Sequence, residues 1–225
     1  MLTSHSGADQ WLHAVHLWNH VDVSAIELAR TCFRATEIDD TVLTAFFSTQ
    51  FSDRLTMLPV NFFSNTTHLQ VPAEFLLSIH TPCIGIVVPV GGNDDGFGAN
   101  HYVLCVLDRD FEECRLYNSL PGYNDIATAT FVLSWLCYPH YAIFTGISRM
   151  QSTNDCGLWV VRNAIFEMVG RRSKIMRTDI VMSVCYSTTI CFSSLPSSQD
   201  VQDFDAKITL RRAEARADVD SSKDK

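Results

Sequence analysis

Residues 151–170 read QSTNDCGLWVVRNAIFEMVG, and this stretch indicates how the chain is organised. A polar loop runs up to Cys156, and the apolar segment that follows has the length of a helix and is ended by Gly170. The first N–H groups of a helix have no intrahelical partner and the helix dipole is positive there, so this position favours thiolate over thiol. We therefore predict a helix over 156–169 with Cys156 as a nucleophile, beside which Gly157 leaves room for a substrate backbone.

Three apolar segments upstream predict strands. Residues 84–90 are rich in β-branched side chains, residues 101–108 follow a Gly/Asp/Asn-rich loop, and residues 113–120 follow a short polar turn. The last two segments predict a hairpin, and pairing across its turn brings the start of one strand near the end of the other. His101 and Asn118 lie at those two ends, so we expect them at the same edge of the sheet.

These residues together predict a nucleophilic site. His101 can take the proton of Cys156, which gives a thiolate–imidazolium pair, and the Asn118 side-chain oxygen can accept from the other ring nitrogen. Gln151 and the backbone N–H of Cys156 can donate to an oxyanion.

The same motifs resemble the cysteine proteases specific for ubiquitin-like proteins, which are the SUMO and NEDD8 deconjugases and are related to the adenovirus protease. The matching segments are His101-Tyr102, Tyr117-Asn118-Ser119 and residues 151–157, and the resemblance extends in order over residues 11–190. It implies a papain-like cysteine protease fold, in which a nucleophile helix packs on a central mixed sheet.

Three positions depart from the pattern of that family. Tyr102 stands in place of the usual Trp, Asn118 in place of the usual Asp, and Gln151 lies one residue nearer to Cys156 than usual. Papain-like proteases work with a Cys-His-Asn triad, so Asn118 is compatible with activity, although it also fits a decayed enzyme.

Alternating helices and strands predict an α+β fold. We expect a loose N-terminus over 1–10, one cysteine protease domain over 11–195 and a polar charged tail over 196–225, in which residues 207–225 form a charged helix or a solvated tail. The remaining predicted elements are helices over 11–31, 41–51, 71–79, 125–137 and 179–184, with a short strand over 141–144.

The composition limits the classes of partner that the chain can bind. A formal net charge of −8 argues against nucleic acid, and no secretory signal or membrane-spanning run is visible. We expect a monomeric protein of the cytoplasm or nucleus, without a membrane partner or a cofactor. His13, His16 and His20 share one face of a predicted helix and suggest zinc, but a polar helix face explains them better, and the eight cysteines form no Cys-x-x-Cys pair.

The resemblance implies cleavage after the C-terminal glycines of a ubiquitin-like protein or its conjugates, with the narrow tail passing beside Tyr102. Two alternatives stay open: a degenerate protease that binds such a partner without cleaving it, and an acyltransferase that uses a related site.

Overall fold

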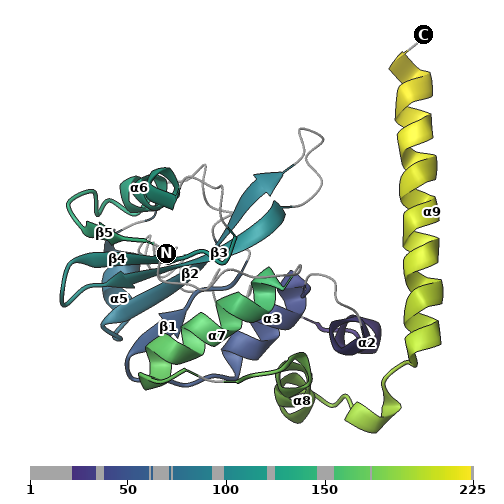
Figure 1. Ribbon diagram of the computed structural model, residues 1–225, viewed down its shortest axis with the longest axis horizontal. Helices are drawn as coiled ribbons and strands as arrows, with labels where there is room; N and C mark the ends of the chain where they lie inside the picture. Colours follow the sequence, from purple (N-terminus) through teal and green to yellow (C-terminus); the bar gives the residue numbers. More distant parts are fainter. Residues whose placement is uncertain are drawn as a thin grey trace, which may run out of the picture.

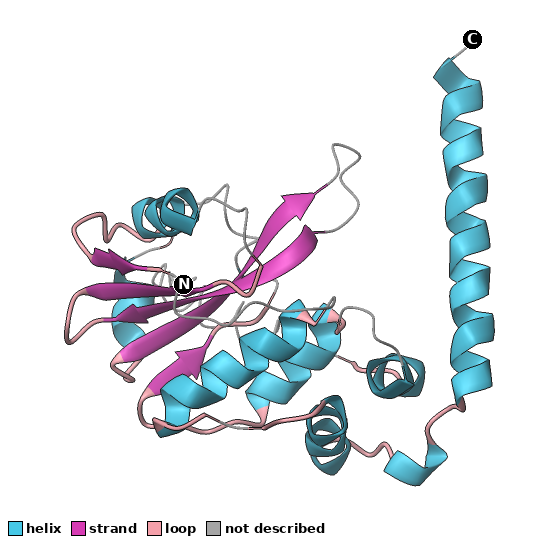
Figure 2. Ribbon diagram, in the orientation of Figure 1, coloured by secondary structure: helices cyan, strands magenta, loops and turns pink. Residues whose placement is uncertain are grey.

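The structure is a computed structural model that describes residues 22–33, 38–60, 62, 71, 73–92, 99–120, 125–145, 155–172 and 174–223. Figures 1 and 2 show a sheet with helices on both sides and one long helix at the edge of the molecule. The elements, in chain order, are α2 (Ala25–Phe33), α3 (Asp40–Ser48), β1 (Leu55–Met57), α5 (Ala73–Ser78), β2 (Cys83–Gly92), β3 (Ala99–Asp108), β4 (Glu113–Tyr117), α6 (Asp125–Trp135), β5 (Ala142–Phe144), α7 (Cys156–Val169), α8 (Arg177–Ser187), the 3₁₀ helix η1 (Phe192–Ser194) and α9 (Ser198–Lys223).

The sheet is mixed, and its strands lie in the order β1-β2-β3-β4-β5. The three central strands pair antiparallel, whereas β1 and β5 join the edges in parallel. The predicted hairpin is confirmed as β3–β4, and Asn118 lies one residue past the end of β4.

Two apolar cores lie on opposite faces of this sheet because successive side chains of a strand point to opposite sides. In β3, Leu104 and Val106 face a core shared with α2, α3, α7 and α8. Val103, Cys105 and Leu107 face a second core, to which α5 and α6 contribute. The sheet is therefore the middle layer, with α7 on one side and α6 on the other (Figure 1).

The helix predicted over 156–169 is confirmed residue for residue as α7. Leu158, Val161 and Ala164 are buried, which is one apolar stripe at helical spacing. Gly170 ends the helix with a φ of 71°, in the left-handed region, and its N–H donates to the carbonyl of Phe166 at 2.8 Å. Glycine suits this position because other residues are strained there.

A partly buried charge cluster ties α7 to β4. Arg115 donates to both carboxylate oxygens of Glu167, with Nε–Oε1 at 2.9 Å and Nη2–Oε2 at 3.0 Å. It also contacts Asp108 at 3.0 Å and Glu113 at 3.1 Å, and the hydroxyl of Tyr117 donates to Glu167. The far end of α7 is thus fixed to the sheet by charge as well as by apolar packing.

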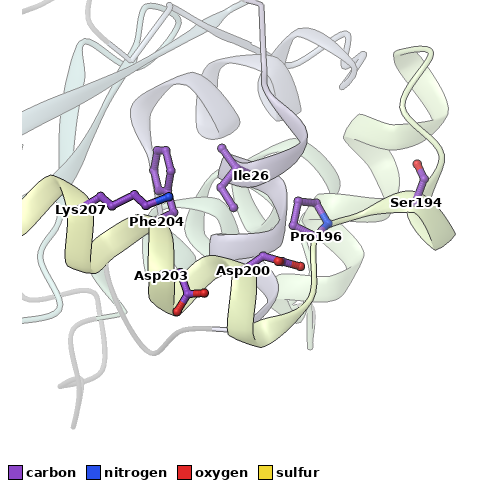
Figure 3. A pocket seen from close by; sticks show the side chains of 7 residues that line it. All are labelled: Ile26, Ser194, Pro196, Asp200, Asp203, Phe204 and Lys207. Carbon is purple, nitrogen blue, oxygen red and sulfur yellow. The ribbon is translucent and has the colours of Figure 1, made fainter.

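Helix α9 stands at the edge of the molecule, and only its first turns lie near α2 (Figure 1). Val201 is buried there, and Asp205 pairs with Arg30 at 2.9 Å. An open hollow lies beside this contact and is shown in Figure 3. The sequence left open whether residues 207–225 form a helix, and α9 answers that question as far as Lys223. The domain boundaries proposed from the sequence stay predictions, and residues 1–21 lie outside the described part of the chain.

Candidate active site

Cys156 is the first residue of α7 and is only 1% exposed. The preceding residue, Asp155, accepts hydrogen bonds from Nε and Nη2 of Arg177, with the Nε contact at 3.1 Å. Another nitrogen of this guanidinium, Nη1, donates to the carbonyl of Thr31 at 3.5 Å. Residues from α2 and α8 therefore hold the start of the nucleophile helix in place.

Gly157 has a packing role that the sequence did not reveal. A Cβ atom built on this residue would lie 3.1 Å from Cβ of Ile38 and 3.5 Å from Cδ1 of Leu43. The absence of a side chain thus allows the first turn of α7 to approach the segment before α3. The substrate-facing role assigned from the sequence stays a prediction.

We expect Gly157→Ala to lower the free energy of unfolding by about 1 kcal/mol. Overpacking a dense core costs about 1–3 kcal/mol, and a gain of up to about 1 kcal/mol in helix propensity offsets part of it. Because the nearest atom is Cβ of Ile38, a change of rotamer does not relieve the contact. Urea denaturation measures the difference, and a variant more stable than the wild type would contradict this packing role.

His101 is the third residue of β3 and is 1% exposed. Its Nε2 lies 2.8 Å from Oδ1 of Asn118, as the predicted hairpin requires. Strand β4 pairs with β3 only from Leu104 to Asp108, so His101 lies beyond the end of β4. The edge of β3 beside His101 is therefore not covered by β4.

The partners of the Asn118 amide define the tautomer of His101. The backbone N–H of Leu120 donates to Oδ1 of Asn118 at 2.9 Å, and Nδ2 of Asn118 donates to Asp125 at 2.6 Å. The atom that faces the imidazole is therefore the amide oxygen, and Nε2 of His101 must carry a hydrogen to bond it. In the neutral imidazole, Nδ1 then holds the lone pair that can accept a proton.

Burial lowers the pKa of His101, although the hydrogen bond to Asn118 and the negative charge of Asp125 oppose this effect. The neutral imidazole is favoured more than it is in an exposed histidine. The thiolate–imidazolium pair expected from the sequence is thus opposed by desolvation of the ring. A neutral His101 suits a general base that takes the proton of a thiol during attack.

The side chain of Tyr102, on β3, contacts α3. Its hydroxyl donates to Oδ1 of Asp40, and its ring packs against the core that contains α7. Burial raises the pKa of Asp40; the Tyr102 bond opposes this shift, and the charge of Asp39 adds to it. The aromatic ring of Tyr102 is therefore held in one position, one residue along the chain from His101. Its contact with substrate stays a prediction.

Helix α7 packs against β3, the strand that carries His101 (Figure 1). Gln151 lies outside the described residues, as do His13, His16 and His20, so the roles considered for them stay untested. One neighbour of the site was not predicted. The sequence indicates Asp125 only as a helix start, but its side chain also accepts a hydrogen bond from Asn118.

The described part of the chain shows neither a metal site nor a membrane-spanning helix. Its His, Cys, Asp and Glu side chains form no group of three that could hold a metal ion. None of its helices combines the length and the apolar character needed to cross a bilayer.

The sequence matches no protein-family model and no curated protein. Solved structures do resemble it. The SUMO protease Ulp1 with its catalytic cysteine oxidised to a sulfenic acid has a TM-score of 0.54 at 12% identity, covering 80% of this chain and 90% of that one. The sulfinic acid form gives 0.52 at 12% identity, covering 80% and 91%. The Ulp1-like SUMO protease catalytic domain of Chaetomium thermophilum gives 0.46 at 14% identity, covering 84% and 94%.

At this identity the likeness shows the fold. The papain-like arrangement predicted from the sequence, with the Cys156 helix packed on a mixed sheet, is confirmed. The chain has the fold of the Ulp1 SUMO protease domains, the ubiquitin-like-protein-specific cysteine proteases that its motifs resemble.

Proposed function

We propose that the chain is a cysteine protease or isopeptidase that cleaves after the C-terminal glycines of a ubiquitin-like modifier. The observation that carries this proposal is the hydrogen bond from Nε2 of His101 to Oδ1 of Asn118, on the strand against which the Cys156 helix packs. This bond leaves Nδ1 as the basic nitrogen, which is what a thiol nucleophile needs. A fold shared with SUMO proteases supports the same chemistry.

In the proposed reaction, Nδ1 of His101 takes the proton from Sγ of Cys156 as the sulfur attacks the carbonyl carbon of the last glycine. The resulting oxyanion accepts from the backbone N–H of Cys156 and, as the sequence suggests, from Gln151. His101 then protonates the leaving lysine amine, the C–N bond breaks and a thioester remains. Water attacks the thioester, His101 takes a proton from it, and the modifier leaves with a free carboxylate while the thiol is restored.

The proposed substrate class follows from the fold and from Tyr102. SUMO is the modifier named for the similar solved structures, and a tail of glycines is narrow enough to pass a fixed aromatic ring. Tyr102 is such a ring because Asp40 holds its hydroxyl and the core holds one side of it. We therefore assign Tyr102 to the wall of the channel that takes the tail.

The test is a panel of SUMO, NEDD8 and ubiquitin, each carrying a C-terminal electrophile, incubated with the full chain. We expect one covalent adduct per chain with one of these modifiers and none with Cys156→Ala. Cys191→Ser is the matched control, because Cys191 is an exposed thiol whose pKa is lowered by a hydrogen bond with Ser193. This control should label like the wild type, and mass spectrometry of the digested adduct locates the modified residue.

Other outcomes contradict the proposal. Tight binding without an adduct would identify a degenerate binding module, whereas acetyl-CoA turnover without an adduct would identify an acyltransferase. Labelling that is lost in Cys191→Ser and kept in Cys156→Ala would show an exposed thiol reacting without a catalytic site.

A further inference from the structure

Asp125, the first residue of α6, contacts the candidate triad through Asn118. Nδ2 of Asn118 donates to Oδ1 of Asp125 at 2.6 Å, which is short for a hydrogen bond from an amide to a carboxylate. On the other side of the amide, His101 Nε2 and the N–H of Leu120 both point to Oδ1 of Asn118. One side chain thus joins an imidazole to a carboxylate through its oxygen and its nitrogen.

The carboxylate determines which way the amide faces. An ionised carboxylate only accepts hydrogen bonds, so a flipped amide would place its oxygen against Asp125 and its NH₂ group against Nε2 of His101. A donor facing Nε2 would favour the tautomer with the hydrogen on Nδ1, which cannot accept the proton of Cys156. In a serine triad, the wrong tautomer costs about 10⁴ in rate.

We infer that Asp125 is a positioning residue that acts through Asn118, so that His101, Asn118 and Asp125 form one relay. This inference deepens the proposed function and rests on it. The resembling family has an Asp at the position of Asn118. Here the negative charge lies one side chain further from the histidine, on Asp125, which bonds Asn118. Its charge also reaches the ring, because it raises the pKa of His101 against the effect of burial.

The arrangement also explains why an acid in place of Asn118 would not improve the site. Asn118→Asp would put two carboxylates about 2.6 Å apart, the separation taken from the present contact, and two carboxylates so close do not both stay ionised near neutral pH. The swap Asn118→Asp/Asp125→Asn removes this conflict. The carboxylate introduced at position 118 would accept from Nε2, and the amide introduced at position 125 would donate to that carboxylate.

The first test needs no protease activity. In a Cys156→Ala background, ¹⁵N NMR of the imidazole reports the tautomer and the titration of His101. We expect Asp125→Asn to lower the pKa of His101 and Asp125→Ala to add the tautomer with hydrogen on Nδ1. The swap should raise this pKa above that of the wild type, because a carboxylate then faces Nε2 directly. Asp110→Asn, which removes an exposed charge near the far end of β3, should leave both readouts unchanged.

The second test uses cleavage of a modifier conjugate. We expect Asp125→Asn to lower kcat by about 10- to 100-fold with little change in KM, the range found when outer-shell groups that orient metal-bound histidines are removed. The swap should recover most of this loss, which a merely structural role of Asp125 would not predict. Asp110→Asn should again match the wild type.

The outcomes separate the relay from the proposed function. If the wild type cleaves the conjugate and Asp125→Asn changes neither kcat nor the titration of His101, the relay is wrong. If the wild type shows no cleavage and forms no adduct while the tautomer and pKa of His101 shift as described, the relay stands and the protease proposal fails.

Discussion

Replacing His101 with glutamine is expected to slow cleavage of a modifier conjugate by about 10²–10⁴-fold, the usual contribution of a general acid–base residue. The glutamine amide can still donate to Oδ1 of Asn118, which His101 contacts at 2.8 Å, but it has no basic nitrogen for the proton of Cys156. Binding of the modifier should change little, so the loss should appear in kcat. Single-turnover kinetics with excess enzyme measures the acylation step directly.

A loss of folding would mimic this result, because His101 is buried. Circular dichroism and urea denaturation of His101→Gln must therefore resemble those of the wild type before the rates are compared. A properly folded variant that cleaves within about threefold of the wild-type rate would contradict the role of His101 as the base.

The pH dependence of the same assay checks the protonation state of His101. Only the neutral ring can accept the thiol proton, so the rate should rise with pH through the pKa of His101 and then level off. Burial lowers this pKa, so the rise should lie at lower pH than the titration of an exposed histidine. A rise that lies above the range of exposed histidine would instead indicate that the thiol limits the rate.

Replacing Glu167 with alanine is expected to lower the free energy of unfolding by about 3–5 kcal/mol, which is typical when one member of a buried ion pair is removed. Glu167 is 4% exposed and accepts two hydrogen bonds from Arg115 and one from Tyr117. Arg115 keeps Asp108 and Glu113 as partners, so we expect the lower end of this range. Urea denaturation with an unchanged m-value measures the loss.

Two further variants separate charge from shape. Glu167→Gln keeps the length of the side chain and an oxygen for Tyr117, so it should cost less than Glu167→Ala. The double variant Arg115→Met/Glu167→Leu removes both charges of the pair and should be less destabilised than the sum of its single variants. Additive losses would show that Arg115 and Glu167 are not coupled.

Much of this site could be predicted from local patterns. An apolar helix bounded by a polar loop and Gly170 has one plausible start, and Cys156 is at it. The pairing of His101 with Asn118 followed from the short turn between two strands, because a short hairpin has few possible registers. These features depend on residues close together in the sequence, where spacing decides geometry.

The features that the sequence did not reveal depend on long-range contacts. Strand β1 has three residues, too few for a periodic pattern, and joins the sheet in parallel. Asp125 begins a helix, as predicted, but nothing in its spacing shows that its side chain reaches Asn118. The pairing of Arg115 with Glu167 left only a weak signal, namely a charged residue within an apolar strand and another within an apolar helix. Neither position names its partner.

In the proposed enzyme, the catalytic groups are held by layers on opposite faces of the sheet. The acceptor chain that orients the imidazole ends on α6, whereas the thiol is carried by α7 on the opposite face. A small sliding of one layer past the other would change the separation of sulfur and nitrogen without breaking a contact inside either layer. Activity then depends on the alignment of the whole sandwich, and a substitution deep in either core can silence the enzyme while both halves stay folded.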